Sequence, residues 1–204
     1  MAPPRKHGTD AILDAARGLI LAEGPRAASV AAIAKASGAP VGTLYHRFGN
    51  RDGVVTAVWL RALERFQVRA MAASGSEPME VAVQMAVAAL DFAQDCNEDA
   101  RLLLAIRPGD LRDAEPAPDF TATLAAMNAP LTHRVAELAR QLYGRGDARS
   151  VDAVTRAVVD LPYAVVRRHA HDAGMPPWVR ADVAASVRAL LTAFPLSAPS
   201  AADT

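Results

Sequence analysis

The 204-residue sequence predicts an all-α protein, and three observations support this prediction. Apolar residues recur at spacings of three and four along most of the chain, as one buried face of an α-helix requires. The alternation of apolar and polar residues that marks half-buried strands is nearly absent. Hydrophobic residues make up 51% of the chain, enough for a substantial core. We therefore expect a small three-helix N-terminal domain followed by a larger helical bundle.

The N-terminal part contains start and stop signals for four helices. Thr9 can cap the first helix, Gly24-Pro25 ends it, and Ser29 can cap the second. Gly38 supplies a tight turn, in which a positive φ is expected, and a short third helix follows. Asn50 can cap a fourth, longer helix that runs to about residue 72.

The C-terminal part begins after a Ser/Gly-rich break near residue 75. Residues 107–118 are rich in Pro, Gly and acids and predict a loop. Pro130 is expected to kink or divide the helix that contains it. The small residues of 196–204 predict a disordered tail. Helices are predicted at about 79–94, 99–106, 120–143, 151–173 and 179–194.

The second and third predicted helices, within residues 29–48, are joined by a short turn that contains glycine. This is the pattern of the helix-turn-helix, whose second helix enters the major groove of DNA. Leu44 and Phe48 share one face and are expected to anchor that helix to the core. The first 53 residues carry seven Lys/Arg against four Asp/Glu in a chain of zero net charge, which suits a DNA-binding module.

The short third helix and its flanks carry the side chains expected to contact DNA. Thr43 can offer a hydroxyl to phosphate or a methyl to thymine, Tyr45 can offer a hydroxyl, and Gly42 lets the backbone approach the duplex. His46 and Arg47 can reach phosphates or base edges. Helix starts place backbone N–H groups where flanking phosphates would lie. The predicted DNA-binding residues are Ser29, Gly42, Thr43, Tyr45, His46, Arg47 and Arg51.

The run from Gly38 to Asp52 closely resembles the TetR family of bacterial transcriptional regulators. That family typically shows Gly-x-x-x-Gly-Thr-Leu-Tyr-x-x-Phe before a helix start of the type Ser/Asn-Lys/Arg-Glu/Asp. The resemblance covers roughly residues 9–60, and the rest of the chain resembles the family in length and helix count. It implies a dimer that binds DNA and responds to a small effector.

Individual positions carry this resemblance further and also depart from it. Pro40 and Val41 stand where the family often has Ser followed by Lys, Arg or Pro. Pro40 has neither a hydroxyl nor an N–H, and Val41 can read DNA only by apolar contact. The residues that match the family's usual DNA contacts are Thr43, Tyr45, His46 and Arg51, with Ser29 matching a phosphate contact.

The helices after residue 73 are expected to bind the effector and to form the dimer. Each apolar stripe also has a simpler interpretation, as solid core or as packing within one subunit. Two copies of the last two striped helices would form a four-helix bundle. The predicted effector pocket is lined by Met85, Phe92, Leu103, Ile106, Met127, Leu131 and Tyr163. The predicted homodimer interface consists of Val154, Val158, Leu161, Val165, Val183, Val187 and Leu190.

Other classes of function find less support in the sequence. There is no Gly-rich phosphate loop, nucleophile elbow or metal-ligand cluster, so we expect no enzyme, cofactor or metal. The single cysteine, Cys96, is interpreted as a small thiol in a reducing compartment. No apolar run is long enough for a membrane span and no signal peptide is recognised, which favours the cytoplasm. One alternative stays open, a helical protein-interaction module whose head no longer reads DNA.

These observations combine into a prediction of organisation and function. A helix-turn-helix DNA-binding domain is expected over 1–53, a connecting helix over 54–72, and an effector-binding and dimerisation domain over 73–195. The resemblance implies a sequence-specific transcriptional regulator. We expect a repressor that a small, largely apolar effector releases from a palindromic operator. Its partners would be double-stranded operator DNA, a second copy of the chain and the effector.

Overall fold

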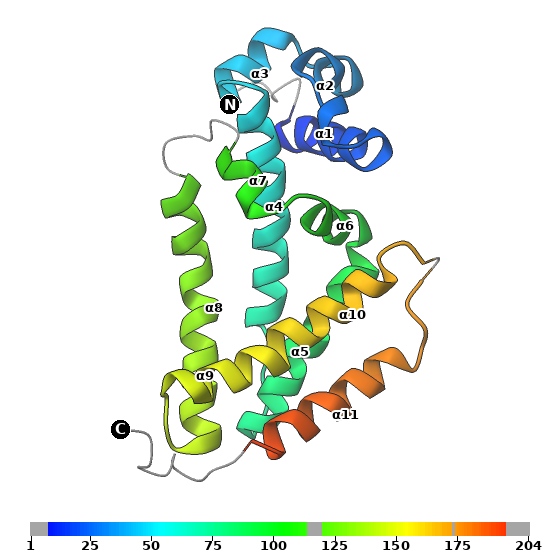
Figure 1. Ribbon diagram of the computed structural model, residues 1–204. Coiled ribbons are helices and arrows are strands. Elements are labelled where there is room, and N and C mark those ends of the chain that lie inside the picture. The colour runs from blue at the N-terminus through cyan, green and yellow to red at the C-terminus, as the bar shows by residue number, and fades with distance from the viewer. Residues whose placement is uncertain (1–7, 114–119, 173, 195–204) are drawn as a thin grey trace, which may run out of the picture. The chain divides into compact units, whose positions relative to one another are not determined.

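The computed structural model of the protein describes residues 8–113, 120–172 and 174–194. Every regular element in these ranges is helical, and none of them contains a strand (Figure 1), so the all-α prediction is confirmed. None of the described helices is both long enough and apolar enough to cross a lipid bilayer. The predicted tail of 196–204 lies outside the described residues.

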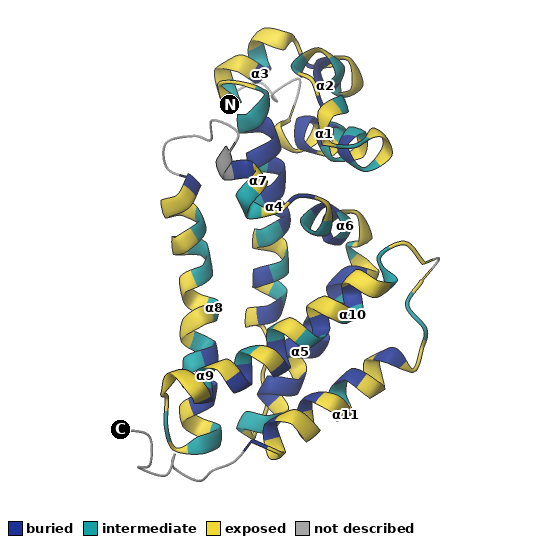
Figure 2. Ribbon diagram, viewed as in Figure 1, coloured by how far each residue is buried: buried dark blue, intermediate teal, exposed yellow. Residues whose placement is uncertain are grey.

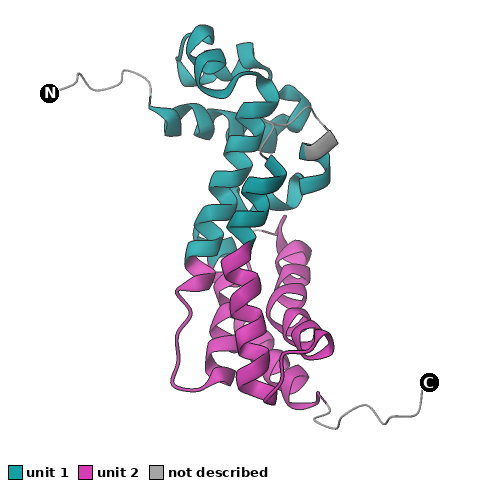
Figure 3. Ribbon diagram, turned by 90° about the vertical axis from the view of Figure 1, so that its left-hand side faces the viewer, with its two compact units in different colours: residues 1–68, 92–128 teal, residues 69–91, 129–204 magenta. Residues whose placement is uncertain are grey.

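The chain divides into two compact units, and the division falls inside three helices (Figure 3). Residues 92–128 pack with the N-terminal helices, whereas the sequence grouped them with the rest of 73–195. Unit 1, residues 1–68 and 92–128, contains α1 (Thr9–Glu23), the 3₁₀ helix η1 (Pro25–Ala27), α2 (Val30–Ser37), α3 (Val41–Phe48), most of α4 (Arg51–Met71), the end of α5 (Pro78–Asp95), α6 (Asn97–Ala105), α7 (Pro108–Asp113) and the start of α8 (Phe120–Tyr143). Unit 2, residues 69–91 and 129–204, contains the remainders of α4, α5 and α8, then α9 (Ala148–Thr155), the π-helix η2 (Arg156–Asp160), α10 (Leu161–His169) and α11 (Val179–Thr192).

Most of the predicted helix ends in the N-terminal part are confirmed. The Ser29 Oγ accepts from the backbone N–H of Ala32 at 3.1 Å, which caps α2. Gly38 ends α2 at φ 69°, in the left-handed region that glycine favours. The cap predicted at Thr9 is wrong, because Gly8 occupies the N-cap position and Thr9 is already helical.

Two predictions in the middle of the chain need correction. The expected loop of 107–118 contains a short helix, α7, whose first residue is Pro108. Proline suits the first helical position, because a backbone N–H there would have no partner within the helix. Leu111, later in the same helix, is buried in the core. Of the two effects expected at Pro130, a kink or a division, the division is wrong, because α8 is continuous from Phe120 to Tyr143.

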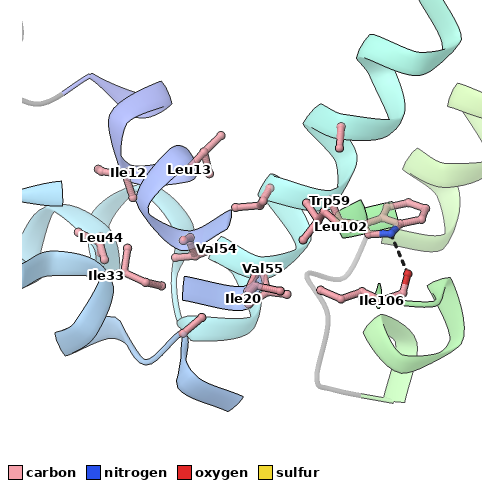
Figure 4. Packing of buried hydrophobic residues seen from close by; sticks show 14 of the residues in the cluster. Ile12, Leu13, Ile20, Ile33, Leu44, Val54, Val55, Trp59, Leu102 and Ile106 are labelled. Atoms are coloured by element: carbon pink, nitrogen blue, oxygen red, sulfur yellow. Dashed lines mark hydrogen bonds between the residues drawn. The ribbon is translucent and has the colours of Figure 1, made fainter. Parts of the chain in front are cut away.

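One contiguous core holds unit 1 together (Figure 4). Leu44 of α3 is 1% exposed and packs with Ile33 of α2, so both short helices are anchored to the same apolar centre. Trp59 of α4 donates its indole N–H to the Ile106 carbonyl at 3.0 Å and lies edge-on to the ring of Phe120. The buried indole therefore has its one donor satisfied while it joins α4 to the segment after α6.

A buried carboxylate joins three helices of unit 1. Asp99 of α6 is 2% exposed and accepts hydrogen bonds from Arg17 of α1 and from the Arg65 Nη1 of α4, the latter at 2.8 Å. Arg17 also pairs with Glu98 at 2.6 Å. Burial alone would raise the pKa of Asp99, but the bonds from Arg65 and Arg17 outweigh it and hold that pKa below its ordinary value.

The long helical segment of unit 2 contains a wide turn that shifts its buried face. Within η2 the N–H of Leu161 donates to the Arg156 carbonyl, five residues back, and Pro162 follows without an N–H of its own. Such a turn adds one residue and relieves the steric conflict that proline causes in a regular helix. The buried stripe therefore moves from the predicted Leu161 and Val165 to Pro162 and Val166.

Four of the seven residues predicted for the dimer interface are buried within one protomer. Val154 and Val158 are buried, and so are Val183 and Val187, and α11 carries both buried and exposed residues along its length (Figure 2). Side chains that the protomer itself covers cannot also contact a partner. Leu190, on the outward side of α11, is 49% exposed, and Leu161 and Val165 are partly exposed.

We expect Asp99→Asn to lower the free energy of unfolding by about 1–3 kcal/mol, because two guanidinium groups lose a charged, buried acceptor. The pKa of Asp99 lies below its ordinary value of 3.8 in the folded state. Its stabilisation is therefore complete above 3.8 and is lost as the pH falls through the lowered pKa. Urea unfolding from about neutral pH down to about pH 3 should show the two proteins converging at the acid end.

Glu98→Gln is the matched control, because Glu98 contacts the same arginine but is mostly exposed. Its cost should stay within about 1 kcal/mol. An Asp99→Asn variant that is no less stable than this control would contradict the role given to the buried carboxylate.

Candidate nucleic-acid interface

Helix α3 has one buried face and one open face. Leu44 fixes the helix to the core from one side, and Phe48 packs half-buried beside it. On the open side Val41 is 44% and Tyr45 53% exposed, and His46 is exposed as well. Because Leu44 and Phe48 hold α3 to the core while Val41, Tyr45 and His46 stay exposed, α3 presents a fixed surface to the outside.

A hollow of about 650 Å³ lies beside this open face. Thr9 of α1 contributes to it, and Arg47 Nη1 donates to the Thr9 Oγ1 at 3.4 Å. The remaining lining comes from α3. The hollow is lined by Thr9, Gly42, Thr43, His46, Arg47 and Phe48, so it contains four of the predicted DNA-binding residues.

Neither the backbone conformation nor the packing at position 42 requires glycine. The φ of Gly42 is not positive, and a Cβ built on it would meet no atom within 4 Å. Gly53 provides the contrast, because a Cβ there would lie 1.9 Å from the Phe48 carbonyl oxygen. Glycine inside a helix costs stability relative to alanine, so the bare Cα of Gly42 suits a close approach from outside the chain.

The two predicted phosphate contacts at helix starts are both engaged within the protein. Ser29 caps α2 through its oxygen, which leaves its hydroxyl hydrogen available to an acceptor. The Arg51 guanidinium donates to the Asp52 carboxylate at 2.5 Å and to the Pro25 carbonyl. Arg51 therefore braces the start of α4 against η1, an arrangement that the sequence did not predict.

The predicted effector-pocket residues do not gather in one unit. Phe92, Leu103, Ile106 and Met127 belong to unit 1, whereas Met85, Leu131 and Tyr163 belong to unit 2. Met85, Phe92 and Ile106 are buried. Tyr163 is 50% exposed on α10, so within the protomer it does not line an enclosed pocket.

Unit 1 holds a buried polar residue that the sequence analysis did not identify. Gln67 of α4 is buried, and its Nε2 donates to the Asn128 Oδ1 of α8 at 2.8 Å. The signal was available, because Gln67 shares a helix face with the apolar Leu63 and Ala70, but a single polar residue in such a stripe is ambiguous. A second hollow, of about 790 Å³, lies between Arg26, Arg51 and the segment 105–111, where a loop was expected.

No group of His, Cys, Asp and Glu side chains suited to a metal ion occurs in the part of the chain that the structure describes. Cys96 lies half-buried just before α6. The site consists of an open helix surface with hydroxyl, imidazole, guanidinium and apolar groups, which can bind a polyanion and contact bases.

The residues that form this surface match a known protein family. Residues 12–58 match the family described as bacterial regulatory proteins, tetR family. These residues span most of α1, the helix-turn-helix and the start of α4. A search of curated proteins found no significant match.

Solved structures share the fold over nearly the whole chain. A tetR-family regulatory protein from Rhodococcus RHA1 is 18% identical, with 93% of this chain and 97% of that chain covered and a TM-score of 0.70. The fatty acid degradation regulator FadR from Bacillus halodurans is 17% identical, with coverage of 92% and 100% and a TM-score of 0.66. The ketosteroid transcriptional regulator KstR2 of Mycobacterium tuberculosis is 18% identical, with coverage of 94% and 96% and a TM-score of 0.66.

The helix-turn-helix match and the shared fold support each other, since one covers the N-terminal residues and the other extends over the helices that follow. Members of this family regulate transcription by binding DNA and are not enzymes. Residues 12–58 therefore match the helix-turn-helix domain of the TetR family of bacterial transcriptional regulators, and the chain shares its fold with solved members of that family.

Proposed function

We propose that this protein is a homodimeric cytoplasmic repressor that binds a palindromic operator and leaves it when a small, largely apolar effector binds. The open face of α3 is the observation that carries the proposal. Its anchor, Leu44, is buried, whereas Tyr45 and His46 are exposed. A helix that is rigidly held and openly presented is what major-groove reading requires.

The DNA contacts divide by chemistry into phosphate and base contacts. Tyr45 and Arg47 offer a hydroxyl and a guanidinium that suit phosphates, and Ser29 and Arg51 lie at helix starts that suit flanking phosphates. Thr43, with both a hydroxyl and a methyl, suits a base edge. Phosphate contacts position the protein on the duplex, and base contacts select the sequence.

The outward side of α11 is the surface we assign to the dimer. Leu190 is exposed there, and the neighbouring exposed residues Ala185, Ser186 and Ala189 are small, so two such helices can approach closely. Reading successive major grooves requires two heads about 34–36 Å apart, which a single copy cannot supply. A two-fold dimer would make the operator palindromic.

The effector would act through unit 1. Leu103 lies on α6, the same helix whose Asp99 holds α1 and α4. A ligand that moves α6 would weaken this contact. The position of α1, and with it the placement of α3, would then change. Two regulators of similar fold are named for fatty acid degradation and for ketosteroids, which agrees with an apolar effector. A coupling of about 1–3 kcal/mol would change DNA affinity roughly 5- to 150-fold.

The proposal is tested by selecting bound duplexes from random DNA with the purified protein. An enriched palindrome with half-sites about one helical turn apart is expected, together with affinity that falls steeply with salt. A folded dimer that enriches no sequence would overturn the proposal. Weak binding that does not depend on salt would favour a protein-interaction module.

Gly42→Ala should move stability and DNA affinity in opposite directions. The added methyl should stabilise the helix by up to about 0.5–1 kcal/mol, because glycine is the costlier residue in the unstrained helix. The same methyl would stand between α3 and the duplex, and we expect operator affinity to fall at least about tenfold. Thermal unfolding and titration of labelled operator measure the two effects.

Gly18→Ala is the matched control, because Gly18 is an exposed helical glycine of α1 whose Cβ would also meet nothing within 4 Å. It should gain similar stability and keep full affinity. Equal affinities for the two variants would show that α3 does not approach DNA at Gly42.

Leu190→Glu should convert the dimer to a monomer at micromolar concentration, because charges placed on both sides of a two-fold interface repel each other. Circular dichroism should stay unchanged, since the side chain is half-exposed in the protomer. Sedimentation velocity measures the change. Val68→Glu, a charge at an exposed position of α4, serves as the control and should remain dimeric. A dimeric Leu190→Glu variant would place the interface elsewhere.

A further inference from the structure

The first turn of α3 carries no side chain able to make a pair of hydrogen bonds to a base. Pro40 occupies the N-cap position and has no N–H, Val41 is the first helical residue, and Gly42 follows without a side chain. Thr43, the next residue, is half-buried. The N-terminal residues of the second helix in a helix-turn-helix are those that meet base edges. Base contact at this turn is therefore apolar or made by a single hydroxyl.

Val41 is only partly covered within the protein. The hydrophobic contact that commonly fixes a helix start joins the residue before the N-cap to the fourth helical residue. Here those residues are Ala39 and Leu44, both buried, and Val41 is not needed for the contact. Val41 is instead 44% exposed, although valine is a poor helix former and its exposure is unfavourable. Its side chain is available to something outside the chain.

The chemistry of the bases leaves one target for such a side chain. Guanine is read by Arg or Lys and adenine by Asn or Gln, and none of these residues occurs from 40 to 43. Thymine differs from the other bases in the major groove by its C5 methyl, which an apolar group can recognise. A β-branched side chain on a helix is held in one preferred rotamer, so contact costs Val41 little entropy.

We infer that Val41 is a specificity-determining residue that packs against the C5 methyl of a thymine in each operator half-site. The inference rests on the proposed function and adds a base identity to it. The bare Cα of Gly42 brings the first turn close enough for this contact. Thr43 also carries a methyl group, so it is the competing reader that the experiment must separate from Val41.

The test replaces the thymines of the selected operator by uracil one position at a time. Each replacement is made at the equivalent position of both half-sites. Uracil lacks only the C5 methyl, so base pairing and the other hydrogen-bonding groups stay the same. At one position per half-site the wild-type protein should lose about fourfold in affinity per half-site, the effect of one methyl group removed from an apolar contact. At that position Val41→Ala should bind the thymine and uracil operators with nearly equal affinity, as a double-mutant cycle requires of contacting groups.

Thr43→Ser, which removes a methyl and keeps the hydroxyl, is the matched control and should remain sensitive to uracil. Three results would overturn the inference. The first is a wild-type affinity that no uracil replacement lowers. The others are a Val41→Ala variant that still loses the full affinity on uracil replacement, or a Thr43→Ser variant that alone no longer loses it. Thermal unfolding checks that Val41→Ala is folded, which its exposure favours. Failure of the proposed function would look different, since no operator sequence would then be enriched from random DNA.

Discussion

The arrangement of unit 1 depends on a carboxylate that has almost no contact with water. Asp99 lies on α6, and its two oxygens accept from guanidinium groups on α1 and α4. A buried ion pair adds little net stability, because desolvation consumes most of its attraction. Breaking it is costly, however, since it leaves charges without partners. Such an interaction favours one placement of three helices over nearby alternatives, and a regulator needs that kind of sharply defined state.

Much of the DNA-reading part follows from local sequence signals. Ser29, Gly38 and Asn50 act at the helix boundaries through short-range hydrogen bonds or backbone preference, and Leu44 follows from spacing. The Asp99 cluster could not be predicted this way, because Arg17, Arg65 and Asp99 are far apart in sequence and each resembles an ordinary surface charge. Its discovery requires knowing which helices pack together. The loop composition of 107–118 likewise concealed α7, whose stability comes from burying Leu111.

The last helices show how one local irregularity changes a long-range prediction. A regular spacing of three and four up to Val165 implied one continuous seam, which the wide turn before Pro162 interrupts. One added residue rotates the following helix by about 100°. Beyond the turn, the buried positions are therefore each one residue later than the regular spacing predicts. The apolar stripes on α9 and α11 are then buried within the protomer. Apolar periodicity therefore identifies that a helix is packed, but it does not identify the partner.

The chemistry of α3 also bears on how readily the protein can be released from DNA. No bidentate base contact is available from its first turn, and Arg51 is already paired with Asp52 and Pro25. A phosphate that recruits Arg51 must replace those bonds, so it gains less than a free arginine would give. Affinity then rests on several modest contacts whose geometry depends on the placement of α1 and α4. Under those conditions a coupling energy of about 1–3 kcal/mol from an effector is enough to shift the equilibrium between bound and free protein.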